Sequence, residues 1–326
     1  MTTRAGSDRL DDAARAGWLY YIAGRTQEEI AARLGVSRQA AQRLVALAVS
    51  EGIVRFRIDH PISRCMDLAA ALADRFGLKR AEVVPADPAS DGGTTGLGEA
   101  GAVEMHRWLR REEPLVLAVG TGRTMKAIAD RLPRLEAPQH RIVSLTGNIG
   151  PDGSAAYYNV IFTLAEVVRA RHFPMTLPVF LSSPEERRLM HAQSLIRATL
   201  ELAAAADVAF VGIGEMDDTA PLFVDGFITR SELSDLRARG AAGEICGWVF
   251  DRDGRFLEGA LAERTASAPI PPRDRATVIA IAKGGKKRAA ILGALSGGVV
   301  NGLVTDEATA EALLAGAERA GDVASR

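Results

Sequence analysis

Apolar positions in the first fifty residues recur with the spacing of α-helices. The helical pattern runs over residues 11–50 and is interrupted at Gly24 and Gly35, which predicts short helices joined by tight turns. Residues 53–58 then alternate between apolar and arginine side chains, which is the spacing of a β-strand. We therefore expect a small, mostly helical domain at the start of the chain.

A break in this pattern predicts a domain boundary. His60-Pro61 interrupts the alternation, and we place the boundary close to Asp59. The N-terminal domain then spans 1–59 and the second domain spans 60–326. A chain of 326 residues is long enough for one small and one large domain.

The second domain is expected to begin with a helix and a long loop. Residues 61–76 have amphipathic helical spacing, and Gly77 is typical of a helix C-cap. Residues 85–98 are rich in Pro, Asp, Gly and Thr, which favours a loop.

Beyond this loop, short apolar runs alternate with glycine-bearing loops and helical stretches. The expected strands are 115–119, 142–145, 208–211 and 277–281, and a helix is expected over 125–132. Continuous apolar runs are typical of strands buried on both faces. The alternation of strands and helices predicts an α/β domain with a doubly wound, mostly parallel sheet.

Two capped helices separated by a glycine stand near the N-terminus. Thr26 and Glu29 form a capping-box pair, so a helix is expected to begin at Gln27. Gly35 supplies the left-handed residue that ends this helix after about two turns, and Ser37 is a good N-cap for the next. This combination predicts a helix-turn-helix.

The second of these helices has a polar face whose side chains suit the major groove of DNA. Arginine reads guanine edges or phosphates, and glutamine reads adenine. The predicted DNA contacts come from Thr26, Gln27, Ser37, Arg38, Gln39, Gln42 and Arg43, and the predicted core positions are Leu44, Leu47 and Ala48. The alternative is an ordinary helical hairpin with a solvated Arg/Gln face.

Charge supports the DNA-binding interpretation locally. The net charge of the chain is only −1, so a nucleic-acid footprint has to be confined to part of it. Between Arg33 and Arg57 there are five arginines and one acidic residue, Glu51. Arg55 and Arg57 belong either to this footprint or to the solvent face of the predicted strand.

Composition excludes several other classes of protein. The two cysteines, Cys65 and Cys246, are far apart in sequence and suggest buried apolar roles rather than a disulfide framework or a thiolate metal cluster. The N-terminus has no apolar segment typical of a signal peptide, and no apolar run approaches the ~20 residues that span a bilayer. We expect a cytoplasmic protein without membrane contact.

Polar residues follow each expected parallel strand and are candidates for a ligand site. Such loops converge at the carboxyl edge of a doubly wound sheet, where ligands bind. The candidate effector-binding residues are Gly120, Thr121, Gly122, Arg123, Thr124, Thr146, Gly147, Asn148, Gly212, Gly214, Glu215, Asp251, Lys283 and Lys287. The loop 120–124 alone is either an anion or hydroxyl site or a packing turn, and residues 286–288 are either ligand contacts or a solvated first turn.

No metal, cofactor or catalytic constellation is predicted. Residues 251–254 (Asp-Arg-Asp-Gly) lack the spaced acids of a calcium loop and are read as a β-turn. The five histidines are dispersed, and no nucleophile elbow or zinc-type pair occurs.

The sequence resembles the SorC-type sugar-binding transcriptional regulators over nearly its whole length. The motifs that carry this resemblance are Leu19–Tyr21, Gly24–Ile30, Leu34–Arg38, Val119–Thr124, Gly212–Gly214, Ser234–Ile245, Phe250–Gly254, Lys287–Ile291 and Leu303–Glu307. The resemblance implies an effector domain similar to phosphosugar isomerases and deaminases, binding of sugars, polyols or sugar phosphates, and tetramers that act on operators of carbohydrate operons.

Two departures from the family pattern concern the effector. The family often has Gly-Trp-Gly where this chain has Gly120-Thr121-Gly122, and Lys283 stands where glycine is usual. The first lies where the effector headgroup would be contacted. The second leaves open whether the effector is phosphorylated.

Two functions are compatible with these features. The first is an allosteric regulator in which an effector changes affinity for operator double-stranded DNA. The alternative is a phosphosugar isomerase or deaminase with a fused helical domain, for which Glu215 and Asp218 are the plausible bases. The enzyme hypothesis leaves the arginine-rich hairpin unexplained, so we favour the regulator.

Overall fold

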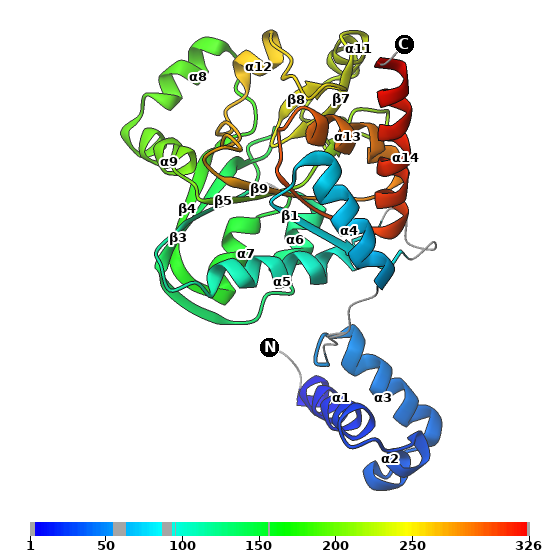
Figure 1. Cartoon of the computed structure of the whole chain (residues 1–326). Helices are drawn as coiled ribbons and strands as arrows, with labels where there is room; N and C mark the ends of the chain where they lie inside the picture. Colours follow the sequence, from blue (N-terminus) through cyan, green and yellow to red (C-terminus); the bar gives the residue numbers. More distant parts are fainter. Residues whose placement is uncertain (1–3, 55–62, 87–92, 95, 156, 325–326) are drawn as a thin grey trace. The chain divides into compact units, whose positions relative to one another are not determined.

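The computed structural model describes residues 4–54, 63–86, 93–94, 96–155 and 157–324 (Figure 1). The chain divides into two compact units, Met1–His60 and Pro61–Arg326. The predicted boundary near Asp59 lies outside the described residues.

The described residues of the N-terminal unit form three helices, α1 (Arg4–Tyr21), α2 (Gln27–Leu34) and α3 (Arg38–Ser50). Its small core joins Ala16 and Leu19 of α1 to Ile30 of α2 and to Ala41 and Val45 of α3. Burial of these side chains holds the two short helices in place, because isolated helices of this length are marginal in water.

The predicted caps are present. The Thr26 hydroxyl accepts a hydrogen bond from the Glu29 backbone N–H at 3.3 Å, and the Glu29 carboxylate accepts from the Thr26 N–H at 2.8 Å. Gly35 has φ +66°, and the Ser37 hydroxyl accepts from the Ala40 N–H at 3.2 Å. Helix, turn and helix are therefore confirmed.

The expected core stripe of the second helix is partly wrong. Ala41, Val45 and Ala48 are buried, whereas Leu44 and Leu47 are only half-buried. The buried stripe of α3 follows Ala41, Val45 and Ala48, which are spaced by four and three residues. Leu44 and Leu47 each precede one of these positions and therefore lie at the margin of the stripe. Of the predicted strand 53–58, the first two residues form a bend, and 55–58 lie outside the described residues.

The second unit is built on a seven-stranded parallel sheet with the order β1-β10-β9-β5-β2-β3-β4. Its strands are β1 (Arg80–Val84), β2 (Val116–Val119), β3 (Leu135–Ile149), β4 (Val168–Pro178), β5 (Val208–Val211), β9 (Thr277–Ile281) and β10 (Gly302–Asp306). A second sheet is antiparallel and contains β6 (Gly214–Glu215), β7 (Ala241–Ile245) and β8 (Trp248–Asp251).

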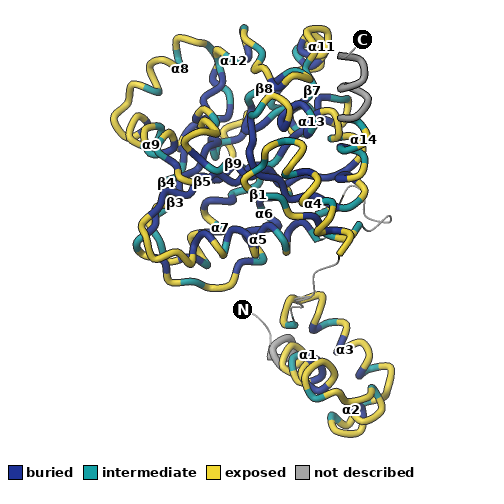
Figure 2. The backbone as a smooth tube through the Cα atoms, in the orientation of Figure 1, coloured by how far each residue is buried: buried dark blue, intermediate teal, exposed yellow. Residues whose placement is uncertain are grey.

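Helices cover both faces of the large sheet, which confirms the doubly wound class (Figures 1 and 2). One face packs against α5 (Leu97–Leu109), α6 (Arg123–Ala129) and α7 (Val160–Val167). The other packs against α4 (Ser63–Phe76), α9 (Ser194–Ala204), α13 (Arg288–Ser296) and α14 (Glu307–Ala324). The remaining helices are α8 (Pro184–His191), α10 (Pro221–Val224), α11 (Arg230–Ala238), α12 (Ala260–Arg264) and the 3₁₀ turn η2 (Gly285–Lys287).

Three expected boundaries differ from the structure. β3 extends far beyond 142–145 in both directions, because it remains paired with β4 through register shifts. Residues 146–148 therefore belong to a strand rather than to a loop. Helix α5 begins at Leu97, inside the expected loop 85–98, and α6 begins at Arg123 instead of Met125.

Candidate functional site

The order of the strands identifies one place in the sheet where a ligand site is favoured. The chain runs from β2 outward to β3 and β4, then returns to β5 and proceeds the other way to β9 and β10. The loops after β2 and β5 therefore leave in opposite directions at the same edge of the sheet. We call this place the switch point, and doubly wound sheets bind their ligands there.

The loop after β2 carries the first group of predicted residues. Gly122 has φ +109°, a conformation that favours glycine. The Thr121 hydroxyl donates to the Tyr158 carbonyl at 2.7 Å, so a neighbouring segment fixes this loop. Arg123 is exposed at the first turn of α6 and Thr124 is half-buried. The loop thus presents a guanidinium and a hydroxyl at the switch point.

The turn between β7 and β8 packs directly against this loop. Cys246 has φ +54°, and its Sγ lies 3.1 Å from the position of a Cβ built on Gly120. Burial raises the pKa of the Cys246 thiol to about 12, although the Thr146 hydroxyl and the Thr121 backbone act in the opposite direction. The thiol therefore stays protonated at neutral pH and serves as a packing group, not a nucleophile.

The end of β3 adds two side chains with unused hydrogen-bonding capacity. Within the part of the chain that the structure describes, the buried Thr146 hydroxyl has no hydrogen-bond partner other than the Cys246 thiol, and Asn148 Oδ1 has none. Between them, a Cβ on Gly147 would collide with the Leu177 carbonyl, so that position favours glycine. Buried polar groups without partners are costly, and at a ligand edge they indicate groups that a ligand satisfies.

A charged cluster lies after β5. Lys287 Nζ donates to the Ile213 carbonyl at 2.7 Å and lies 3.5 Å from Glu215 Oε2. The Glu244 carboxylate accepts from the Gly247 N–H at 2.9 Å and fills the space beside Gly214, where a Cβ would collide with it. Burial raises the pKa of Glu244; the Gly247 N–H and Lys287 oppose this, and Glu215 reinforces it. We call Thr146, Asn148, Glu215, Glu244 and Lys287 the switch-point cluster.

Lys283 is directed elsewhere. Its Nζ lies 3.7 Å from Asp306 Oδ2 at the end of β10, and the two side chains are 4% and 5% exposed. The Gly284 N–H donates to the Thr309 hydroxyl at 2.9 Å, and the Thr309 N–H donates to Asp306 Oδ1 at 2.9 Å. The loop that holds Lys287 in the cluster is therefore also tied to the start of α14.

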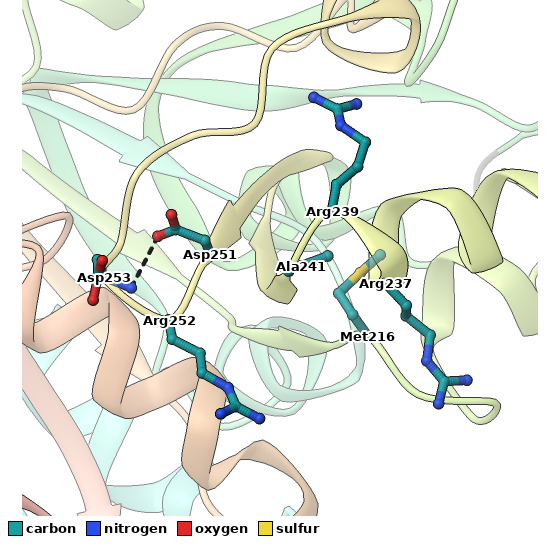
Figure 3. A pocket seen from close by; sticks show the side chains of 8 residues that line it. Met216, Arg237, Arg239, Ala241, Asp251, Arg252 and Asp253 are labelled. Carbon is teal, nitrogen blue, oxygen red and sulfur yellow. Dashed lines mark hydrogen bonds between the residues drawn. The ribbon is translucent and has the colours of Figure 1, made fainter.

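Asp251 lies apart from the cluster, in a surface hollow of about 520 Å³ beside the small sheet. Its Oδ1 accepts from the backbone N–H of Asp253 and Arg255, both at 2.9 Å, so it stabilises its own β-turn. Three arginines line the hollow, but Arg239 points away from Arg237 and Arg252 (Figure 3). The arginines do not converge on one anion.

In the N-terminal unit, most of the predicted DNA-contacting residues share one exposed region. Ser37, Arg38, Gln39, Gln42 and Arg43 are all exposed at the start of α3. Arg38 lies 3.6 Å from Glu28, and Arg43 Nε donates to the Gln39 carbonyl at 3.3 Å. Exposed ion pairs of this kind are weak, so these side chains are available to an incoming anion. Of the remaining two, Thr26 forms the capping box and Gln27 is half-buried.

Comparisons with known proteins cover both units. Residues 60–315 match the sugar-binding domain family, and residues 16–61 match the MarR family. The erythritol catabolism regulatory protein EryD of Brucella abortus is 37% identical over 303 residues, 93% of this chain and 96% of that protein. The transcriptional regulator LsrR of Klebsiella pneumoniae is 34% identical over 314 residues, 93% of this chain and 92% of that protein.

A solved structure agrees with these matches. The full-length sorbitol operon regulator SorC from Klebsiella pneumoniae has a TM-score of 0.69 and 29% identity, over 94% of this chain and 99% of that one. The chain belongs to the SorC-type family of sugar-binding transcriptional regulators. This SorC-type regulator therefore acts in transcription, and the enzyme alternative is set aside.

In this SorC-type regulator, Glu244 and Cys246 pack at the candidate site but were not predicted to do so from the sequence. Both lie on a hairpin that enters the switch point from a second sheet, and this hairpin has no βα signature. The glycines at 243 and 247, on either side of these residues, were the signal in the sequence that could have indicated this hairpin.

In the described part of the chain, no helix is long and apolar enough to cross a membrane, and no group of three potential metal ligands occurs.

Proposed function

We propose that this regulator binds operator double-stranded DNA through α3, with Arg38, Gln39, Gln42 and Arg43 in the major groove. Ser37, the α2 N-cap Thr26 and the first α2 residue Gln27 would contact the phosphate backbone. The observation that carries this proposal is the exposed Arg/Gln face beginning at a capped helix N-terminus. A recognition helix contacts base edges with its N-terminal residues, and backbone N–H groups there favour phosphate.

The effector is proposed to bind at the switch point between β2 and β5. The loop residues Gly120–Thr124 would contact one end of it, and the switch-point cluster would satisfy hydroxyl groups at the other. Support comes from three buried oxygens that can accept hydrogen bonds from a ligand. Among the described residues, Asn148 Oδ1 has no hydrogen-bond partner, Thr146 Oγ1 contacts only the Cys246 thiol, and Glu215 Oε2 has only the ion pair with Lys287. Carboxylate and amide oxygens accept hydrogen bonds, and the hydroxyls of a sugar or polyol donate them. Lys283 and Asp251 lie outside this region and are less direct candidates.

The name of the relative EryD suggests which ligands to test first. A thermal-shift screen of the full chain should include erythritol, its phosphates and a panel of longer polyols and sugars. Stabilisation by one class, lost when Asn148 is changed to Ala, supports the site. If none of them stabilises the protein, the proposal fails.

The loop 283–287 is proposed to carry the effector signal. It holds the cluster through Lys287 and the first turn of α14 through the Gly284–Thr309 hydrogen bond. Helix α14 in turn contacts α4, where Arg64 Nε donates to Glu311 at 3.1 Å. Helix α4 begins at Ser63 and is the first helix described in the larger unit, so a shift of the loop would reach the N-terminal end of this unit.

A cytoplasmic homo-oligomer, a tetramer by family resemblance, completes the proposal. A helix-turn-helix reads one half-site, so operators match the two-fold symmetry of paired heads. Sedimentation of the full chain with and without operator DNA tests the assembly.

A further inference from the structure

Helix α1 has two apolar faces, and its own unit covers only one of them. Ala13, Ala16 and Leu19 are buried, and Ala16 and Leu19 pack with side chains of α2 and α3. A second stripe, which we call the α1 stripe, consists of Leu10, Ala14, Trp18 and Ile22, four residues apart. Leu10 is 42%, Trp18 57% and Ile22 72% exposed. The Ile22 N–H donates to the Trp18 carbonyl at 2.9 Å, so the helical spacing continues to the end of the stripe.

The stripe is unusual for a solvent-facing surface. Residues spaced by four lie on one side of a helix, so these side chains form one continuous apolar strip. Contiguous apolar surface of this kind marks interaction sites, and tryptophan is enriched at the centres of protein–protein interfaces.

Charged residues beside the stripe indicate which partner it fits. Asp11 and Arg15 are exposed and lie on the same flank of α1, and neither forms an ion pair among the described residues. We propose that the α1 stripe pairs with the α1 stripe of a second copy of this chain, in an antiparallel arrangement whose two-fold axis passes near Ala14.

This arrangement is self-complementary in both shape and charge. With the axis at Ala14, Leu10 of one copy faces Trp18 of the other, and the small alanine at the crossing allows close approach. A two-fold axis brings equal flanks together, so Asp11 of one copy lies beside Arg15 of the other. Their axial offset is two residues, about 3 Å at the rise of an α-helix.

The inference deepens the proposed function, because two paired heads present two α3 helices to the two half-sites of an operator. It rests on α1 alone, however, so its test needs no DNA or effector. If it fails, reading of DNA by α3 is left untouched.

Site-specific crosslinking of the full-length chain provides the test. With Ala14→Cys, mild oxidation is expected to give a covalent dimer, since the native Cys65 and Cys246 are buried. Ala32→Cys, an exposed alanine on α2, is the matched control and should give at least tenfold less dimer. Equal yields at both positions, or no dimer at Ala14, would overturn the proposal.

A charge-reversal series separates specific pairing from random collision. Adding Asp11→Arg to Ala14→Cys places two arginines side by side and should lower the dimer yield several-fold. Adding Arg15→Asp as well restores opposite charges and should restore the yield. If the single and double reversals behave alike, or if the new cysteine forms a disulfide with Cys65 or Cys246 of its own chain, a second copy does not cover the stripe.

Discussion

The Lys287 side chain holds the switch-point cluster together, and its replacement by Met should destabilise the larger unit. At 3.5 Å, the attraction to Glu215 is about 5 kcal/mol for an effective dielectric constant near 20, before the cost of desolvation. The charged hydrogen bond to the Ile213 carbonyl contributes about 1.5–3 kcal/mol. Since Lys287 is 23% exposed and desolvation offsets much of the attraction, we expect a net loss of about 2–3 kcal/mol.

Thermal unfolding monitored by tryptophan fluorescence measures this loss. Trp18 lies in the N-terminal unit, whereas Trp108 and Trp248 lie in the larger one, so a Trp18→Phe background confines the signal to the larger unit. The expected shift of the midpoint is roughly 5–10 °C, from the usual 2–4 °C per kcal/mol for domains of this size.

The loss of folding stability caused by Lys287→Met, which we call the deficit, should also depend on pH through Glu244. Burial raises the pKa of Glu244, and Lys287 opposes that rise. Removing Lys287 raises the pKa further, so the folded state favours the protonated acid more strongly. Stability associated with such a group is present at low pH and is lost as pH rises through the folded-state pKa. The deficit of Lys287→Met should therefore be larger at pH 8 than at pH 5.

A double variant provides the control. Adding Glu215→Gln removes the carboxylate that Lys287 compensates, so it should recover about half of the loss. If the two substitutions were simply additive, or if the deficit were the same at pH 5 and pH 8, the charge-based account of the cluster would be refuted.

Four further outcomes are expected. Changing Arg38 and Gln39 together to Ala should reduce operator affinity at least 100-fold in mobility-shift titrations while effector stabilisation is unchanged; retained affinity would contradict the reading helix. Glu244→Gln should stabilise the larger unit increasingly as the pH rises above the ordinary pKa of a glutamate, because the amide has no proton to lose in this buried position; pH-dependent urea melts measure the gain. Gly214→Ala should lower stability by about 1–3 kcal/mol, because its Cβ meets the Glu244 carboxylate. In a Thr309→Val background, which lacks the hydroxyl that accepts from Gly284, Lys287→Met should not change the hydrogen exchange of α4 and α14; in a Thr309→Ser background, which keeps a hydroxyl, it should. A change in the exchange of these helices in both backgrounds would reject the loop as the signal route.

Local signals predicted the helix-turn-helix well because its determinants are adjacent in sequence. A capping box, a left-handed glycine and an N-cap serine each act within one helical turn. The buried face of α3 was predicted only in part, because alanines and a valine of this helix, rather than its larger leucines, occupy the centre of the small core. Packing against α1 decides that choice, and no local pattern encodes it.

The larger unit shows the opposite balance. Its continuous apolar strands and glycine loops predicted the parallel sheet, in which the loops after β2 and β5 leave the same edge in opposite directions. They did not predict β3 beyond 142–145, because its extension depends on pairing with β4 through register shifts. Glu244 and Cys246 were missed for a similar reason: they reach the switch point only when a separate antiparallel hairpin packs against it.

The pairing of β1 with β10 has a consequence for how the protein is made. Arg80 lies in register with Gly302, so β1, near the start of the larger unit, finds its partner only after the intervening strands and helices have been synthesised. Helix α4 likewise packs against α14. The core of the small unit is formed by side chains of α1, α2 and α3 alone, so this unit can fold while the ribosome is still translating the larger one. A transcript that ends early would then yield a DNA-binding head without the domain that responds to the effector.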